Sequence, residues 1–379
     1  MKGNSLLLLV VVCAVVTGCD RSSSPDTTNA VAGSEFVLEQ SADSLRIAYG
    51  SCADDDAPEH PVWDALGAVN ADLVLMLGDN VYADSPEFNA APSARLMRRE
   101  YAKLAAAPGF QRLRASTPMF ATWDDHDFGR NDGGASFAFK TQAAEIFKEF
   151  WQYPADDPAR AREGVYAERR IRHSGLDVQV ILLDTRSFRG PLREASRSLA
   201  CPLLNYEHNT TGTFLGEAQW AWLAEQLDKP ADFRILVSSQ QVIADQHCFE
   251  KWGNFPNERL RLFTLIRESG VKNIVLLSGD RHLGEISRLP ADYPGGAGFD
   301  LYEVTSSPLS ARSGFGWGET NDYRVNTDNL RESQFGVLDL TPRPGEGESS
   351  LAVSMHLLDA EGQVRFSAQQ TFTLPGAAP

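Results

Sequence analysis

The chain has 379 residues, with 51 Asp and Glu against 35 Lys and Arg, so its formal net charge is −16 at pH 7. This charge argues against nucleic acid or an anionic lipid surface as a partner that is held by bulk electrostatics. It does not argue against a phosphate substrate, because clustered carboxylates bind cations and the bound cations attract phosphate.

The first residues are typical of an export signal. Lys2 supplies a positive charge, and residues 6–16 form an apolar stretch that is too short to span a membrane comfortably. The following Thr17-Gly18-Cys19 is similar to a bacterial lipobox. We therefore expect residues 1–18 to be a signal peptide and Cys19 to become the lipidated first residue of the mature chain. Ordinary secretory cleavage, with Cys19 as a passenger, is the alternative.

This anchor predicts an exported protein that is attached to a bacterial membrane through lipid only, with its folded domain in the periplasm or otherwise outside the cytoplasm. Residues 19–34 are small and polar, which is typical of a flexible tether. Residues 35–379 have a length that suits one large α/β domain, and we find no second linker and no internal repeat. The sequence does not indicate an oligomeric state.

Three cysteines remain once the signal peptide and the lipid are set aside: Cys52, Cys201 and Cys248. An odd number leaves one of them unpaired in an oxidising compartment. Cys201 and Cys248 lie in loop-like segments, whereas Cys52 follows an apolar run and sits in a polar cluster. We predict a Cys201–Cys248 disulfide and a free Cys52 with a functional role, although sequence alone does not fix the pairing.

Six short apolar runs recur along the chain, and each ends in a cluster of polar residues. Their lack of alternation is typical of strands that are buried on both faces. The runs cover residues 45–49, 73–77, 119–123, 178–183, 235–237 and 274–277. Amphipathic stretches predict helices at residues 94–106, 141–151, 217–227 and 257–268. Alternating strands and helices predict an α/β sheet, whose ligand site lies beyond the carboxyl ends of its strands.

The last part of the chain has a different pattern. It predicts strands at residues 302–305, 335–340, 351–357 and 364–374. We expect these strands to form a second sheet that packs on the first, which gives a four-layer αββα sandwich with mixed sheets flanked by helices. Two separate layers in a different order fit this pattern nearly as well.

The polar clusters contain residue types that bind metals. Asp79 and Tyr82 lie three residues apart just past a strand, so one loop can direct both at a common point, and a carboxylate there can bridge two cations. A phenolate and a thiolate are poor ligands for Mg²⁺ or Ca²⁺ and better ones for a ferric ion. Tyr82 and Cys52, taken alone, are more simply explained as packing residues; beside the other strand ends they indicate iron together with harder cations.

Asp124, Asp125 and Asp127 surround His126, and such a cluster repels itself unless cations or protons neutralise it. A solvated acidic loop is the simpler alternative. Asn131 offers a neutral oxygen ligand nearby, although Asn-Asp-Gly-Gly is also a typical turn.

Asp280 and His282 are two residues apart, so both side chains point to the same side of an extended segment. They can therefore bind one metal ion or two adjacent ions. Arg186 and Arg281 are candidates for bidentate contacts to phosphate oxygens, with surface salt bridges as the alternative for each.

Together these motifs resemble the alkaline phosphatase D (PhoD-like) branch of the calcineurin-like metallophosphoesterases. The resemblance covers about residues 45–309 and rests on the order and spacing of the motifs. The matching stretches are Gly50-Ser51-Cys52, Gly78-Asp79-Asn80-Val81-Tyr82, Trp123-Asp124-Asp125-His126-Asp127, Leu183-Asp184-Thr185-Arg186, Ser238-Ser239-Gln240 and Leu277-Ser278-Gly279-Asp280-Arg281-His282.

The resemblance implies the αββα sandwich, a phosphomonoesterase or phosphodiesterase activity, and a ferric ion (Fe3+) accompanied by calcium (Ca2+). In the wider superfamily the third motif reads Gly-Asn-His. Here Asp125 stands where the ligating Asn would be, and His126 stands where the phosphate-facing His would be. Carried onto this sequence, the other metal ligands are Cys52, Asp79, Tyr82, Asp280 and His282.

These expectations combine into metal-dependent hydrolysis of phosphate esters, in which a water activated by the metals attacks phosphorus in line. Arg186 is expected to balance charge on the phosphate oxygens, and His126 to stabilise the transition state or protonate the leaving oxygen. A phospholipase-like phosphodiesterase is the alternative among enzymes. A lipoprotein that binds metal or phosphate without turnover is the alternative from another class.

Overall fold

The computed structural model describes residues 35–37, 44–54, 56–199, 201–313, 319–345 and 349–374. The expected signal peptide, the tether and the lipidation site Cys19 lie outside these ranges. Contacts divide the chain after Ala30, so every described residue belongs to the second unit. Within the described ranges, no helix is long and apolar enough to cross a membrane.

One mixed sheet has six strands in the order β15-β14-β13-β2-β3-β4. The first three strands of the chain in this sheet run parallel, and the last three join them in antiparallel fashion. Its strands are β2 (Leu45–Gly50), β3 (Leu73–Leu77), β4 (Met119–Thr122), β13 (Gln334–Arg343), β14 (Ser350–Asp359) and β15 (Val364–Thr373).

The second mixed sheet has seven strands in the order β1-β5-β6-β9-β10-β12-β11. Its centre, β6-β9-β10-β12, is parallel. Its strands are β1 (Glu35–Val37), β5 (Ala167–His173), β6 (Leu176–Leu182), β9 (Phe233–Val237), β10 (Ile274–Ser278), β11 (Gly284–Leu289) and β12 (Leu301–Ser306). A separate two-stranded ribbon consists of β7 (Arg193–Glu194) and β8 (Tyr206–Glu207).

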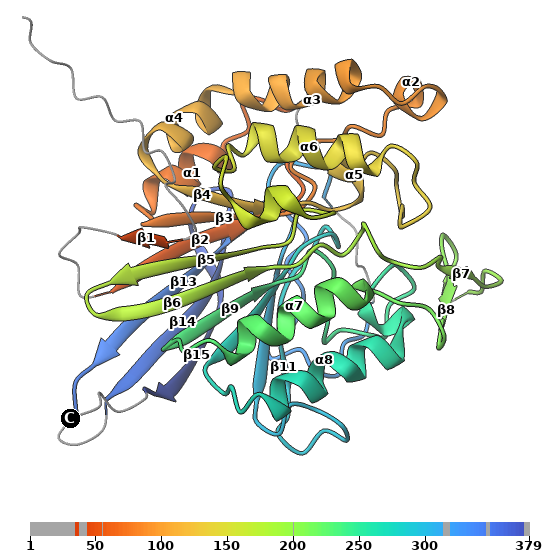
Figure 1. The fold of residues 1–379 in the computed structure, drawn as a ribbon. Helices are drawn as coiled ribbons and strands as arrows, with labels where there is room; N and C mark the ends of the chain where they lie inside the picture. Colours follow the sequence, from red (N-terminus) through yellow and green to blue (C-terminus); the bar gives the residue numbers. More distant parts are fainter. Residues whose placement is uncertain are drawn as a thin grey trace, which may run out of the picture. The chain divides into compact units, whose positions relative to one another are not determined.

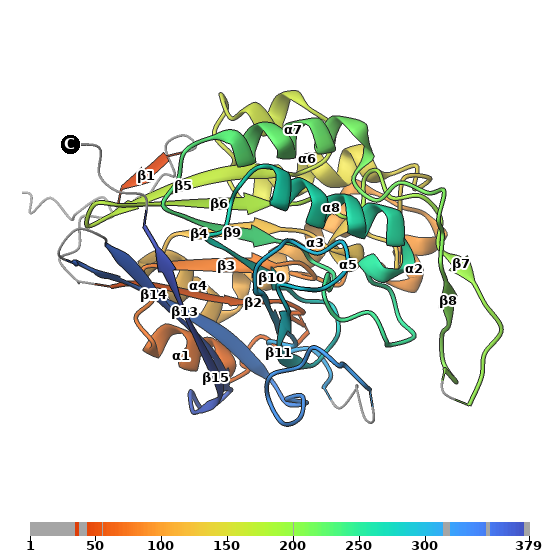
Figure 2. The same cartoon turned by 90° about the horizontal axis from the view of Figure 1, so that it is seen from below.

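Helices cover the outer faces of the two sheets, as the two views show (Figures 1 and 2). The six-stranded sheet packs against α1 (Val62–Ala68), α3 (Ala94–Ala106), α4 (Pro108–Ser116) and α6 (Lys140–Phe150). The seven-stranded sheet packs against α7 (Gly216–Asp228) and α8 (Pro256–Glu268). The short elements are α2 (Pro86–Ala90), α5 (Asp125–Phe128), η1 (Pro158–Ala161) and η2 (Trp252–Asn254). This arrangement is the predicted four-layer αββα sandwich.

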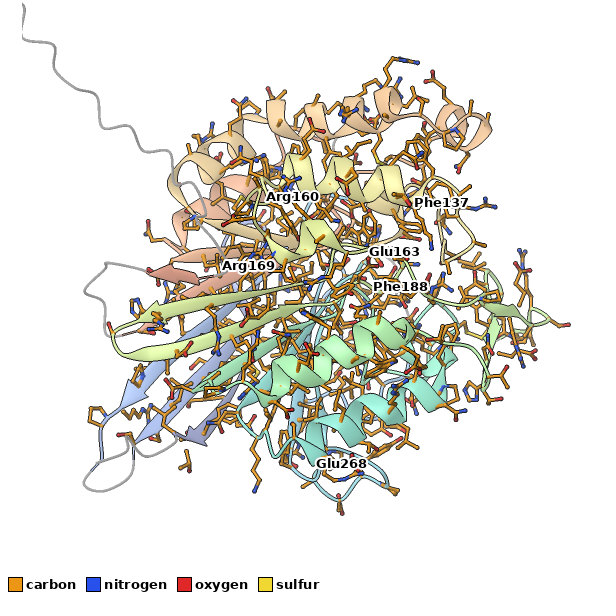
Figure 3. All side chains as sticks on the ribbon, viewed as in Figure 1. Phe137, Arg160, Glu163, Arg169, Phe188 and Glu268 are labelled. Carbon is orange, nitrogen blue, oxygen red and sulfur yellow. A yellow bond between two sulfur atoms is a disulfide. The ribbon has the colours of Figure 1, made fainter. Side chains whose placement is uncertain are left out.

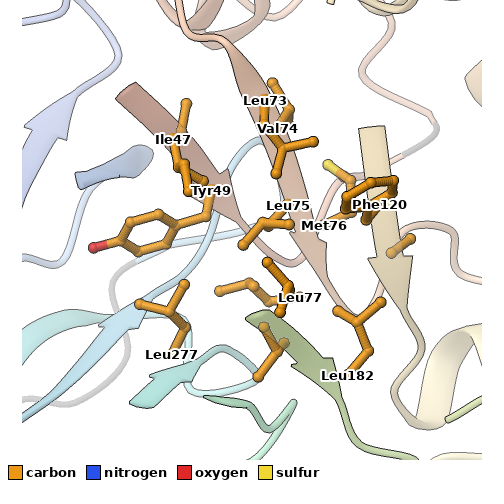
Figure 4. Packing of buried hydrophobic residues seen from close by; sticks show 14 of the residues in the cluster. Ile47, Tyr49, Leu73, Val74, Leu75, Met76, Leu77, Phe120, Leu182 and Leu277 are labelled. Atoms are coloured by element: carbon orange, nitrogen blue, oxygen red, sulfur yellow. The ribbon is translucent and has the colours of Figure 1, made fainter. Parts of the chain in front are cut away.

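The core lies between the two sheets. Leu75 and Leu77 of β3 pack towards Leu182 of β6 and Leu277 of β10 (Figure 4), and all four side chains are at most 1% exposed. Leu276, the residue before Leu277 in β10, packs on the other face of the sheet with the apolar side chains of α7 and α8. Burial on both faces explains why these strands are continuous apolar runs, since each buried leucine contributes about 1.5–3 kcal/mol.

A buried ion pair fixes the segment between α6 and β5. Arg169 of β5 donates to Asp157 at 2.6 Å, and both side chains are at most 4% exposed. Arg160 of the same segment donates through Nε to the carbonyl of Tyr153 at 2.9 Å, and Figure 3 labels it together with Arg169. Removing one partner of such a pair is costly because the other charge stays buried.

The expected separate sheet of C-terminal strands is wrong in its detail. β13 pairs with β2, with Gly336 opposite Tyr49, so β13–β15 extend the sheet of β2–β4. The strand β12 instead joins β10 in the other sheet. Three of the six predicted motif-bearing strands therefore lie in each sheet. Apolar runs show that a strand is buried, but they do not show which strand it pairs with, because any buried neighbour satisfies the same pattern.

Candidate metal centre

Four of the predicted ligands lie directly after strands and have left-handed backbone conformations. The φ angles are 59° at Cys52, 50° at Asp79, 65° at Asp280 and 50° at His282. These are four of the eight non-glycine residues with positive φ among the described residues. Such a conformation costs about 1–3 kcal/mol per residue and persists at functional sites where the surroundings hold it. The strain therefore gathers at the predicted centre.

Close approach of two loops requires a glycine before Asp79. Gly78 has a φ of 115°, and a Cβ atom there would lie only 2.7 Å from Cβ of Asp124. The loop after β3 therefore contacts the loop after β4, which brings Asp79 beside Asp124.

One end of the centre combines a thiol with a carboxylate. Sγ of Cys52 lies 3.5 Å from Oδ2 of Asp79, and Oγ of Ser307 donates to Sγ at 3.0 Å. The backbone N–H of His282 in turn donates to Oγ of Ser307 at 2.9 Å. Burial raises the pKa of Cys52 to about 12, so a bound cation is required to hold it as a thiolate. Ser307 had no signal in the sequence beyond its position near the end of the resembling region.

Tyr82 and His282 complete this end. The Tyr82 hydroxyl lies 3.2 Å from Nε2 of His282, and Nδ1 of His282 lies 2.5 Å from the carbonyl of Arg312. That carbonyl can only accept, so Nδ1 carries the proton and Nε2 directs its lone pair towards the centre. Burial lowers the pKa of His282 to about 4, which keeps the ring neutral and able to bind a metal ion.

The other end is a group of four carboxylates, of which Asp79, Asp124 and Asp125 are buried and Asp280 is half-buried. One oxygen from each of Asp79, Asp124, Asp125 and Asp280 lies within 4.8 Å of the others. Burial, together with neighbouring negative groups, raises the pKa of Asp79 and of Asp280 well above the usual range. Oδ2 of Asp124 and Oδ1 of Asp125 are buried and have no hydrogen-bond partner within the described part of the chain. Orphaned carboxylate oxygens in a cluster of this charge fit bound cations.

His126 lies at the edge of the carboxylate group. Its backbone N–H is 3.3 Å from Oδ1 of Asp79, and its Nδ1 is 2.8 Å from Oδ1 of Asp84. Burial alone would lower the pKa of His126, but Asp125 and Asp84 raise it to about 9. The ring is thus held by Asp84 in the protonated form, and the Tyr82 ring lies 4.2 Å away between ring centroids.

Arg186 lies behind the carboxylates and not on an open surface. Its side chain is 0% exposed. Its Nε donates to Oδ1 of Asp124 at 2.5 Å, and its Nη1 donates to Glu250. Burial alone would raise the pKa of Asp125, but His126 and Arg186 lower it to about 2. Arg186 therefore stabilises negative charge on the metal-facing carboxylates.

The sequence did not indicate two further carboxylates. Oxygens of Asp132 and Glu250 lie within 4.8 Å of an oxygen of Asp125. The Asp132 N–H also donates to Oδ2 of Asp125 at 2.6 Å. Asn131, the predicted oxygen ligand, is exposed at the start of this turn, and its neighbour Asp132 takes the inner position. Glu250 lies in a loop with no strand before it, so no pattern marked it.

Arg281 lies between the two ligands of the last motif, and its guanidinium contacts other side chains of the protein. Its Nη2 lies 2.5 Å from Oε1 of Glu319, and its guanidinium stacks on the Phe249 ring at 4.2 Å. Cys201 and Cys248 form a disulfide, whereas Cys52 is free and buried.

Comparisons with known proteins identify the family and support the fold. Residues 47–350 match the PhoD-like phosphatase family. Alkaline phosphatase D of Bacillus subtilis (strain 168) is 23% identical in an alignment 324 residues long, which covers 76% of this chain and 53% of that protein. The chain thus spans about half the length of this curated relative. A solved structure of PhoD superposes with a TM-score of 0.62 at 16% identity, over 87% of this chain and 70% of that one, which supports the fold. The chain belongs to the PhoD-like phosphatase family.

Proposed function

We propose that this chain is a metal-dependent phosphoric ester hydrolase whose reaction takes place at the cluster of Asp79, Asp124, Asp125 and Asp280. The observation that carries the proposal is the pair of orphaned, buried oxygens on Asp124 and Asp125 beside a thiol, a phenol and an imidazole. Family membership supports the same chemistry. We further propose that residues 35–379 act as one catalytic domain.

The donor atoms divide into two kinds. One set combines the sulfur of Cys52, the carboxylate of Asp79, the phenolic oxygen of Tyr82 and the imidazole of His282. This set suits Fe3+. The carboxylate group suits a hard cation such as Ca2+, which prefers oxygen ligands. In this proposal Asp124 supplies the oxygen ligand that we expected from the exposed Asn131. Bound cations would supply Lewis-acid activation of the phosphate ester and of the attacking water.

The protein's own residues orient the catalytic histidine and protonate the leaving oxygen. Asp84 holds Nδ1 of His126, which leaves Nε2 for a phosphate oxygen or a leaving oxygen. A protonated His126 can donate that proton as the ester bond breaks, and the carboxylate of Asp84 raises the pKa of the ring and so favours the protonated form. Arg186 acts as a positioning residue through Asp124, in place of the direct phosphate contact expected from its sequence position.

Location forms a separate part of the proposal. We propose that the chain is exported and anchored by lipid on Cys19, so that the domain works outside the cytoplasm of a bacterium. Metabolic labelling with a radioactive fatty acid tests this directly. Label should enter the full-length chain and be absent from Cys19→Ala; equal labelling of both chains would contradict the anchor.

The hydrolase is tested by assaying the full-length chain, loaded with iron and calcium, on nitrophenyl phosphate and bis-nitrophenyl phosphate. Cleavage of either ester that Asp79→Asn abolishes supports the proposal, and the faster ester distinguishes a monoesterase from a diesterase. Asp64→Asn is the matched control, since Asp64 is an exposed aspartate on α1. Tight metal binding without cleavage of either ester would instead indicate a binding protein.

A further inference from the structure

Two of the most exposed apolar side chains in the described part of the chain lie at one hairpin tip. The ribbon of β7 and β8 belongs to neither large sheet and extends away from them (Figure 2). Leu199 is 103% exposed and Leu203 is 59% exposed. They lie on either side of Cys201, so the tip presents two leucines to its surroundings.

This tip is held in place. The N–H of Ala195 donates to the carbonyl of Asn205 at 2.8 Å, and the N–H of Cys201 donates to the carbonyl of Ser198 at 3.2 Å. These bonds continue the ribbon beyond its two strands. The disulfide joins Cys201 to Cys248 in the body of the fold. The exposed leucines are therefore presented on a braced support.

The base of the hairpin contacts the metal centre. The Tyr206 hydroxyl donates to Oδ2 of Asp132 at 2.6 Å, and the Asp132 N–H donates to Oδ2 of Asp125 at 2.6 Å. Two hydrogen bonds thus connect the hairpin to a metal-facing carboxylate. The hairpin that carries the tip therefore begins beside the metal centre.

The shape and charge of the tip favour lipid over protein as the partner. A stable protein interface buries about 800 Å² on each side, which requires a broad surface, whereas a lipid layer admits a narrow projecting tip. Residues 195–206 contain one charged residue, Arg197, and no carboxylate, although the whole chain carries −16. Insertion of this tip would therefore not bury a negative charge.

We propose that Leu199 and Leu203 insert into the surface of a lipid bilayer and so hold the metal centre next to the membrane. The contact is apolar, so it needs no anionic lipid and is compatible with the negative net charge. The inference goes beyond phosphoester hydrolysis and does not depend on it. It is consistent with the lipid anchor proposed at Cys19.

The test uses the full-length chain with Leu203→Cys carrying the fluorophore NBD, together with vesicles of neutral phosphatidylcholine. The unsubstituted chain measures background labelling at Cys13, Cys19 and Cys52, of which Cys52 is buried. Vesicles should shift the emission to the blue and protect the label from dithionite. The same label at Leu260→Cys, an exposed leucine of α8, should remain accessible. A label at residue 203 that stays fully accessible would overturn the proposal.

A second substitution makes the result specific for the tip. Leu199→Asp in the labelled chain should reduce the ratio of protected to accessible label by about 10-fold or more, as expected when one buried leucine is lost. Val364→Asp, at a residue that is 57% exposed elsewhere on the fold, should leave this ratio unchanged. Protection that appears without vesicles and grows with protein concentration would indicate a second copy of the chain, and would also overturn the lipid contact.

Discussion

Sγ of Cys52 lies 3.5 Å from Oδ2 of Asp79, and both residues hold left-handed φ angles, of 59° and 50°. They follow neighbouring parallel strands, so the sheet itself brings the thiol to the carboxylate. The backbone strain at both positions indicates that their directions matter for more than packing.

We predict that Cys52→Ser removes iron selectively. A hydroxyl is a poorer ligand for iron than a thiolate, and even the loss of an outer partner of a ligand costs about 10–100-fold in metal affinity. Iron affinity should therefore fall at least about 100-fold, while calcium stays bound at the carboxylates. Elemental analysis of the purified variant measures both. Ser307→Ala removes only the hydroxyl that donates to Cys52, so it should cause a smaller loss of iron affinity. Unchanged iron in Cys52→Ser would rule out a thiolate ligand.

His126→Ala should lower turnover by about 10²–10⁴-fold, the usual contribution of an acid–base group, with metal content nearly unchanged. The physical reason is that the imidazolium held by Asp84 is lost while the carboxylates remain. Steady-state kinetics and elemental analysis of the same sample check both halves of the prediction. His208→Ala, at an exposed histidine, is the control. Loss of metal in His126→Ala would show instead that His126 is a ligand.

Glu250→Gln should destabilise the fold strongly. The carboxylate of Glu250 is the partner of the fully buried Arg186, and removing one member of a buried pair costs about 3–5 kcal/mol. Urea unfolding measures the change. Glu217→Gln removes an exposed partner of Arg261, and surface pairs of this kind contribute at most about 1 kcal/mol. If the free energy of unfolding fell by the same small amount in both variants, the buried pair of Glu250 and Arg186 would not hold the site together.

Much of the fold could be predicted because burial leaves a pattern in the sequence. Residues 73–77 and 94–106 were expected as a strand and a helix, and β3 and α3 have these bounds. Pairing between distant strands could not be predicted, because β2 and β13 satisfy their burial equally well with other partners.

The candidate site could likewise be predicted only in part. Asp79 and Asp280 could be anticipated because the carboxyl ends of strands converge at one edge. Glu250 and Asp132 could not, because they reach the cluster through loops whose positions depend on tertiary contacts. The burial of Arg186 could not be predicted either, because a motif gives the residue type and not the direction in which the side chain points.

His247 should make stability depend on pH. It is buried, neither ring nitrogen has a partner among the described residues, and burial with nearby Arg281 and Lys251 lowers its pKa well below 6.5. Below about pH 6.5 the imidazole of His247 therefore binds a proton in the unfolded chain but not in the folded chain. This difference destabilises the fold as pH falls.

The effect of His247 is measured by urea unfolding of the wild-type chain and of His247→Phe between pH 7.5 and 5. The wild-type chain should lose up to about 1.4 kcal/mol more per pH unit below pH 6.5 than the variant. His208→Phe, at an exposed position, should follow the wild-type curve. Parallel curves for the wild-type chain and His247→Phe would mean that the buried ring is protonated in the fold.

The most direct test of the metal centre is elemental analysis of the purified full-length chain, assayed in parallel on nitrophenyl phosphate and bis-nitrophenyl phosphate. The account predicts iron together with calcium and hydrolysis of at least one ester. A chain that holds no iron after supplementation and cleaves neither ester would contradict it, and would leave Cys52 and Tyr82 as packing residues.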